Sequence, residues 1–198
     1  MKSTTPTKIL GLALLMPFLH GCVALFAGGA VAGADVIHDR RAVGTVLSDR
    51  NIQLSAADEI NRHKPLVRDG NNVKVVVYNG VMLLCGQVRS ERLKQMAHSA
   101  VDGFNGVVRL VDDIEVTDKP QGFWGRRGDN GISTRVKTGL LDITSIPGFD
   151  PTRINVTTAH GVVYLMGLVT HEEGKAVTTV ARNTPDVVKV VELFQYTD

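Results

Sequence analysis

The sequence contains few of the residues that build metal, redox or catalytic sites. It has two cysteines and six histidines among 198 residues, and the histidines are scattered along the chain. His171-Glu172 begins like the zinc motif H-E-x-x-H, but the place of the second histidine is taken by Lys175. The nucleophile elbow G-x-S-x-G does not occur. We therefore expect no cofactor, no metal site and no catalytic residue, and the sequence predicts a protein that is not an enzyme.

Long apolar runs are also scarce, and none after residue 22 is long enough to cross a bilayer. The chain starts with a short basic region that contains Lys2 and Lys8, and an apolar run follows over residues 9–19. Such a run is too short to span a membrane comfortably and is typical of a cleaved signal peptide. Residues 1–21 are therefore predicted to be a signal peptide.

The signal region ends in Leu19-His20-Gly21-Cys22. This ending resembles the lipobox of bacterial lipoproteins, in which the cysteine becomes the N-terminus and carries acyl chains, palmitate among them. Several acyl chains together anchor a protein stably. His20 departs from the residues usual at its position, so an ordinary cleaved signal with a chance cysteine is the alternative. The resemblance predicts Cys22 as a lipid anchor, and Val23, which is not Asp, implies sorting to the outer membrane.

The charge of the chain is nearly balanced. The formal net charge is +2, and residues 1–21 contribute two lysines and no acidic residue, which leaves 2 − 2 = 0 after their removal. Proteins that bind nucleic acid carry a basic stripe on the folded domain. The sequence therefore predicts no nucleic-acid partner.

The second cysteine, Cys85, has no partner within the chain once Cys22 is acylated. It lies in a strand-like apolar run over residues 81–86. A reactive thiol and a small buried hydrophobic residue are the two interpretations, and the apolar surroundings favour the buried one.

The most informative feature is an internal repeat, which indicates a duplicated structural unit. Residues 79–88 align with residues 160–169 at an offset of 81, and residues 107–111 align with residues 187–191 at an offset of 80. In the first copy, Asn79-Gly80 joins two β-rich runs and predicts a hairpin.

Each copy is predicted to have the order αββαβ. Helices are expected at about 54–63 and 132–143, and closing strands at 107–116 and 187–196. Apolar positions with helical spacing follow each hairpin, and Thr170 with its glutamate three residues later has the spacing of a capping box. The predicted fold class is α+β, with two helices packed against a small three-stranded mixed sheet in each domain.

The predicted organisation has four parts after the signal peptide. The Gly- and Ala-rich start is a lipidated tether, and a segment rich in Gly and Pro separates the two domains. The predicted boundaries are 22–44 for the tether, 45–117 for the first domain, 118–131 for the linker and 132–198 for the second domain.

The two copies resemble BON domains. The resemblance rests on the hairpin-strand pattern G-V-x-L-x-G-x-V, a Glu-rich helix start and a closing strand V-x-x-V, and residues 164–170 are an especially close match. The lipobox, Asp39-Arg40-Arg41 and two such domains occur in the order found in outer-membrane lipoproteins with two BON domains. The resemblance implies a lipid-anchored protein on the periplasmic face of the outer membrane that supports envelope integrity and binds anionic phospholipid through its second domain.

The start of the second domain has the residues of an interfacial segment. Ile132, Val136 and Leu140 share one helical face that should pack on the sheet, whereas Leu141 points nearly opposite. Cations beside an exposed aliphatic or aromatic group suit an anionic membrane surface. The residues predicted to bind phospholipid are Trp124, Arg126, Arg127, Gly131, Ile132, Arg135 and Leu141. At Gly131 similar proteins can carry a bulky aromatic residue.

Other interpretations remain open from the sequence alone. Trp124 is equally compatible with packing between the two domains, and the neighbouring arginines with a solvated linker. The main alternative function is a protein-binding adaptor for an outer-membrane assembly machine or a cell-wall enzyme, which an exposed strand edge would favour. A hydrolase with an unfamiliar site is the least favoured alternative.

Overall fold

The computed structural model describes residues 40–198, apart from the side chains of Phe123 and Trp124. The predictions for the signal peptide, for Cys22 and for nearly all of the 22–44 tether lie outside the described residues. Residues 40–198 belong to one compact unit. Among residues 40–198, no helix combines the length and the apolar character that a membrane span requires.

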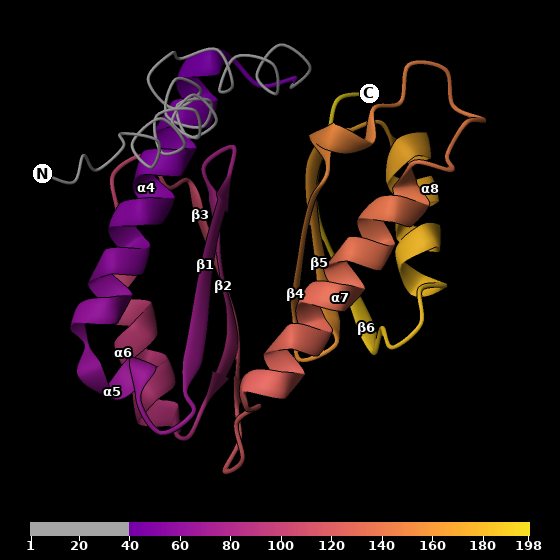
Figure 1. Cartoon of the computed structure of the whole chain (residues 1–198). Coiled ribbons are helices and arrows are strands. Elements are labelled where there is room, and N and C mark those ends of the chain that lie inside the picture. Colours follow the sequence, from indigo (N-terminus) through magenta and orange to yellow (C-terminus); the bar gives the residue numbers. More distant parts are fainter. Residues whose placement is uncertain (1–39) are drawn as a thin grey trace, which may run out of the picture. The chain divides into compact units, whose positions relative to one another are not determined.

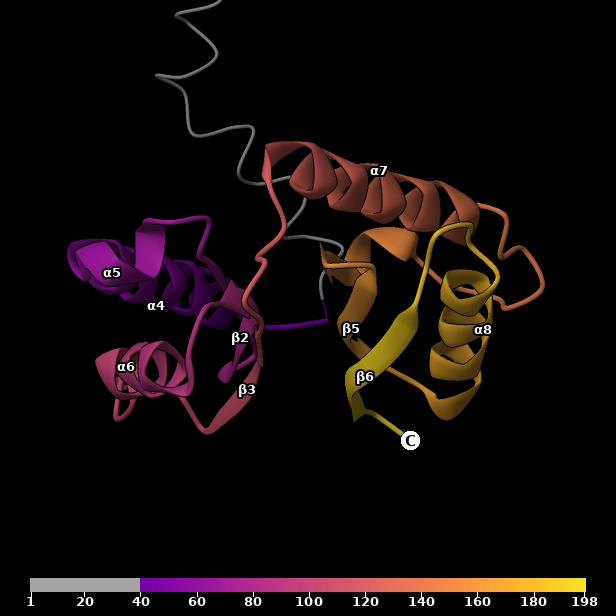
Figure 2. The same cartoon turned by 90° about the horizontal axis from the view of Figure 1, so that it is seen from below.

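The first domain contains three helices and a three-stranded sheet. Its elements in chain order are α4 (Val43–Arg62), α5 (Lys64–Val67), β1 (Asn72–Tyr78), β2 (Val81–Val88), α6 (Glu91–Val101) and β3 (Arg109–Val116). The strand order is β1-β2-β3, with β1 antiparallel and β3 parallel to β2. Figure 1 and Figure 2 show the helices of this domain on one side of its sheet.

The second domain repeats this arrangement without a counterpart of α5. Its elements are α7 (Phe123–Leu140), a short 3-10 helix η2 (Pro151–Arg153), β4 (Asn155–Ala159), β5 (Val162–Val169), α8 (His171–Arg182) and β6 (Lys189–Tyr196). The strand order is β4-β5-β6, again with one antiparallel and one parallel pair. The prediction of two α+β units with the order αββαβ is confirmed.

The predicted hairpins form at equivalent turns. Asn79 and Gly80 have φ values of 47° and 74°, and His160 and Gly161 have 52° and 71°. Positive φ at both central residues is what a type I′ turn requires, and this turn matches the twist of the strands that it joins. The predicted capping box at the start of α8 is present, because Thr170 and Glu173 satisfy each other's backbone N–H groups.

Both first helices begin earlier than predicted. Helix α4 starts at Val43 and not near residue 54, and α7 starts at Phe123, within the predicted 118–131 linker. The first half of α4 lacks the apolar inward face by which an amphipathic helix is recognised in a sequence. Its inward side carries Asp49 and Gln53, whereas Leu47 and Leu54 face outward and are 56% and 53% exposed. Polar residues that bind buried backbone groups take the positions where an amphipathic helix has apolar residues.

Each sheet has one face covered by its own helices. In the second domain the buried residues between helices and sheet include Ile132, Val136, Leu140 and Leu165. The remaining faces of the two sheets share a third cluster, to which β1 and β2 contribute Val76, Tyr78, Val81, Leu83 and Cys85, and β4, β5 and β6 contribute Ala159, Tyr164, Met166 and Leu193. The two domains are therefore held together by a buried apolar contact between their sheets.

Candidate functional site

A buried aspartate fixes the first helix of each domain to its hairpin. The carboxylate of Asp129, which is 2% exposed, accepts hydrogen bonds from the backbone N–H groups of His160 at 3.0 Å and Gly161 at 2.9 Å. Asp49 binds the Asn79-Gly80 turn in the same way at 2.5 and 3.0 Å. Neither aspartate was predicted from the sequence as a functional residue. Their separation of 80 residues, close to the repeat offset, is the signal that could have found them.

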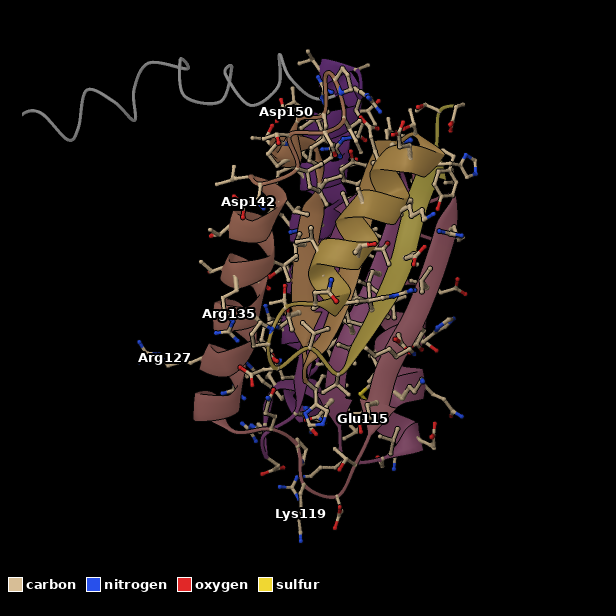
Figure 3. The ribbon with its side chains drawn as sticks, turned by 90° about the vertical axis from the view of Figure 1, so that its right-hand side faces the viewer. Glu115, Lys119, Arg127, Arg135, Asp142 and Asp150 are labelled. Atoms are coloured by element: carbon tan, nitrogen blue, oxygen red, sulfur yellow. The ribbon has the colours of Figure 1, made fainter. Side chains whose placement is uncertain are left out.

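This attachment determines which side of α7 faces solvent. Because Asp129 and Val136 face the domain, Arg127, Thr134 and Thr138 lie on the exposed side of the helix. Leu141, the first residue after α7, is 65% exposed. Figure 3 shows Arg127 and Arg135 extending from the same helix and Asp142 at its far end.

The predicted phospholipid-binding residues fall into three groups. Arg127 and Leu141 are exposed. Gly131 is half-buried, and a Cβ atom added to it would contact only the Arg135 guanidinium. Ile132 is 5% exposed and belongs to the core of the second domain, so it positions the helix and does not present a side chain to a membrane. The backbone of Trp124 is in the first turn of α7.

Protein groups bind the side chains of Arg126 and Arg135. Arg126 is half-buried, and its Nη1 donates a hydrogen bond to the carbonyl oxygen of Gln121 at 3.2 Å. Arg135 Nη2 lies 2.8 Å from a carboxylate oxygen of Asp186 and also donates to the carbonyl oxygen of Pro185. The exposed ion pair with Asp186 contributes little to stability, but it balances part of the positive charge of Arg135.

Positive charge dominates the exposed surface of α7. The helix contains Arg126, Arg127, Arg135 and Lys137, and its one acidic residue is the buried Asp129. The negative charge of Asp129 is directed to backbone N–H groups of the hairpin turn. Solvent along α7 therefore meets cations and no carboxylate from the helix itself.

The C-terminal end of α7 borders an apolar pocket. The pocket has a volume of about 360 Å³ and is lined by Thr134, Lys137, Thr138, Leu141, Pro151, Thr152 and Ile154. Small-molecule sites in proteins are of this size and are mostly apolar, with a few polar groups. The exposed Leu141 is thus part of a hollowed surface and not an isolated apolar side chain.

Two arginines before α4 join the two domains. Arg40 donates to both carboxylate oxygens of Glu173 at 2.7 and 2.8 Å and to the carbonyl oxygen of Leu168 at 3.1 Å. Arg41 lies 2.6 Å from a carboxylate oxygen of Asp49 and stacks over the Tyr78 ring at 3.8 Å. Arg40 therefore binds the second domain and Arg41 the first.

The cysteine of the first domain is a buried apolar residue, as predicted. Cys85 is fully buried in the contact between the sheets, and burial raises the pKa of its thiol to about 12. A thiol with so high a pKa is mostly protonated at neutral pH and is a poor nucleophile. Among residues 40–198 no group of three or more His, Cys, Asp or Glu side chains is arranged to hold a metal ion.

Comparison with known proteins identifies relatives over most of the chain. The BON domain model matches residues 48–118 and again residues 128–198. The outer membrane lipoprotein DolP of Haemophilus influenzae is 30% identical over 91% of this chain and 91% of its own length. The 21 kDa hemolysin of Actinobacillus pleuropneumoniae is 28% identical over 80% of this chain and 79% of its own.

A more distant relative is the osmotically-inducible protein Y of Escherichia coli, which is 27% identical over 70% of this chain and 67% of its own length. Both BON matches coincide with a sheet and the helices that cover it. The chain therefore belongs to the BON domain family and carries two BON domains in tandem.

Proposed function

We propose that this protein is a non-enzymatic lipoprotein of the outer membrane that binds anionic phospholipid through α7 of its second BON domain. The acyl chains on Cys22 would hold it on the periplasmic face, and binding through α7 would place it where it supports outer-membrane integrity. The relative from Haemophilus influenzae is named an outer membrane lipoprotein, which supports this location.

The observation that carries the proposal is the composition of the exposed side of α7. Arg127, Arg135 and Lys137 are exposed there, whereas the acidic residue of the helix is buried. Leu141 adds an exposed aliphatic side chain at the end of the helix. Cations attract anionic headgroups, each contributing about 1 kcal/mol near a membrane surface, and an aliphatic group gains free energy by entering the interface.

Flotation with liposomes tests the proposal. Residues 23–198, which lack the acylated cysteine, are expected to float with phosphatidylglycerol vesicles and not with phosphatidylcholine vesicles, and added salt should release them because it screens the charges. Leu141→Ser is expected to weaken binding by about tenfold, since it removes a fraction of the burial energy of a leucine. Arg127→Glu reverses a charge, which is expected to cost about 2 kcal/mol of binding free energy and so to weaken vesicle binding roughly thirtyfold.

Matched controls come from the first domain. Leu54→Ser removes a leucine that is 53% exposed on α4, and Arg92→Glu reverses an exposed arginine on α6. Both controls should float like the unchanged protein. If residues 23–198 fail to bind anionic vesicles even at low salt, or if the control variants weaken binding as much as the α7 variants, the proposal is wrong.

A protein-binding adaptor is the second candidate, and the strand order favours it. Each sheet has only three strands, and β3 and β6 each pair on one side, with β2 and β5. An edge strand of eight residues can accept an extended peptide from a partner. This function predicts that edge substitutions such as Glu192→Pro, at an exposed residue whose N–H points away from β5, abolish capture of an outer-membrane assembly or cell-wall protein without changing flotation.

A further inference from the structure

A second pocket lies beside the apolar one along the same side of α7. It has a volume of about 350 Å³ and is lined by Lys74, Asn130, Ser133, Thr134, Lys137, Val156, Thr157 and Thr158. Thr134 and Lys137 line both pockets, so the two are neighbours on one surface. We refer to the two pockets together as the α7 groove.

The two ends of the α7 groove differ in chemistry. One end has the ammonium groups of Lys74 and Lys137 with the hydroxyl groups of Ser133, Thr157 and Thr158. The other end has the side chains of Leu141, Pro151 and Ile154. No carboxylate lines either pocket.

The lysine that completes the polar end comes from the first domain. Lys74 is half-buried on β1, and its Nζ donates a hydrogen bond to the carbonyl oxygen of Thr158 on β4 at 2.5 Å. A hydrogen bond between Ser133 and Thr158 at 2.7 Å ties α7 to the same edge of β4. The cation is therefore held at the groove by the contact between the domains.

We propose that the α7 groove binds one molecule of anionic phospholipid, with its phosphate at Lys74 and Lys137 and the start of one acyl chain against Leu141 and Pro151. This inference rests on the proposed function and adds to it a discrete site, shared by the two BON domains, for a single lipid. Two ammonium groups match the oxygens of a phosphate diester, and the ordered change from polar to apolar lining matches an amphipathic ligand and not a free anion.

A discrete site and a charged membrane-binding surface differ in how they bind a single soluble lipid. A surface attracted to headgroups binds vesicles but has no saturable affinity for one soluble lipid. The α7 groove should bind a short-chain lipid below its micelle concentration, and it should do so with a contribution from Lys74, which lies outside α7 and outside the second domain.

Titration with a monomeric short-chain lipid tests the inference. Dihexanoyl phosphatidylglycerol, dihexanoyl phosphatidylcholine and inorganic phosphate are added separately to residues 23–198, and binding is followed by NMR shifts of the backbone amides. Saturable binding of the phosphatidylglycerol is expected, with shifts at Lys74, Ser133 and Thr158, and the other two probes should bind at least tenfold more weakly. Equal binding of inorganic phosphate would overturn the assignment of the apolar end.

Variants at the two lysines complete the test. Lys74→Ala and Lys137→Ala are each expected to weaken phosphatidylglycerol binding about fivefold, as expected for the loss of about 1 kcal/mol per cation. Lys74→Arg and Lys137→Arg should restore it. Lys175→Ala, which changes an exposed lysine on α8 of the same domain, is the matched control and should bind like the unchanged protein.

The outcomes separate this inference from the proposed function. Flotation with anionic vesicles but no saturable binding of the short-chain lipid, or unchanged affinity in Lys74→Ala, would overturn the α7 groove and leave the proposed function standing. Absence of flotation would overturn the proposed function itself. The amide spectrum of each variant reports whether it is folded, so that a loss of binding is assigned to the side chain.

Discussion

At the scale of single residues, two buried aspartates determine how each domain is assembled. Asp49 and Asp129 each accept two hydrogen bonds from adjacent N–H groups of a type I′ turn. Hydrogen bonds to a charged group contribute about 1.5–3 kcal/mol, and a buried N–H that loses its acceptor has a similar cost. These contacts also orient α7, so the candidate binding surface depends on a residue that does not touch it.

Substitution of Asp129 by Asn is expected to lower the free energy of unfolding by about 2 kcal/mol. The amide keeps one acceptor oxygen but places an NH₂ group against an N–H donor of the turn, so one of the two hydrogen bonds is lost. Urea unfolding followed by circular dichroism measures the change. Asp142→Asn, at an exposed residue after α7, should change stability by less than about 0.5 kcal/mol. If Asp129→Asn also changed stability by less than about 0.5 kcal/mol, the role assigned to the carboxylate would be contradicted.

The ionised state of Glu173 also depends on specific partners. Burial alone would raise the pKa of this carboxyl group, but hydrogen bonds from the Arg40 guanidinium and the Thr170 N–H outweigh it and hold the pKa below the ordinary value of 4.5. A carboxyl group with a lowered pKa in the folded state stabilises the fold above its unfolded pKa, and this contribution is lost as the pH falls through the folded pKa.

The stability difference between the unchanged protein and Glu173→Gln should therefore depend on pH. At neutral pH the variant is expected to unfold at lower urea concentration, because the ionised carboxylate is replaced by a neutral amide beside Arg40. As the pH falls below 4.5 the difference should shrink, since Glu173 becomes protonated. Urea titrations at a series of pH values measure it, and a difference that does not change with pH would contradict the assigned pKa direction.

At the scale of elements, the sequence was sufficient for the hairpins, α6, α8 and the closing strands. Their signals are local: a turn pair such as Asn79-Gly80, a capping box, or apolar residues at one spacing. The starts of α4 and α7 were predicted too late because their inward positions are polar, occupied by Asp49 and Asp129. Those residues are explained only by the backbone groups of a turn that lies 30–32 residues further along the chain, which no local pattern reveals.

The candidate site was predictable only where its residues follow from a local pattern. The exposed Leu141 and Arg127 follow from the periodicity of α7 once its phase is known. Ile132 was assigned both to the core and to lipid contact, and its 5% exposure places it in the core. The position of Lys74 beside α7 could not be predicted, because it depends on which faces of the two sheets meet.

At the scale of the whole described unit, an apolar contact between two sheets is secured at its edge by polar groups. Tyr164 donates to Asp113 at 2.9 Å, and the Tyr78 hydroxyl group accepts a hydrogen bond from the Leu168 N–H at 3.3 Å. The bidentate Arg40–Glu173 pair adds a charged contact, in which the Glu173 side chain is 5% exposed. A bidentate pair of this type, with two parallel charge-assisted hydrogen bonds, is stronger than a hydrogen bond between neutral groups.

The Arg40–Glu173 pair is expected to limit separation of the two sheets, and Cys85 reports that separation. Cys85 is fully buried between the sheets and is the single thiol of residues 23–198, so a maleimide reaches it only when the sheets part or the domain unfolds. Arg40→Ala is expected to raise the labelling rate of Cys85 about tenfold, because breaking the pair favours the separated state by roughly 1.4 kcal/mol. Arg62→Ala, which removes the ion pairs with Asp58 and Glu59 on α4, is the control and should label at the unchanged rate. Labelling in urea confirms that the thiol reacts once exposed; an unchanged rate in Arg40→Ala under native conditions would mean that the apolar contact alone holds the domains together.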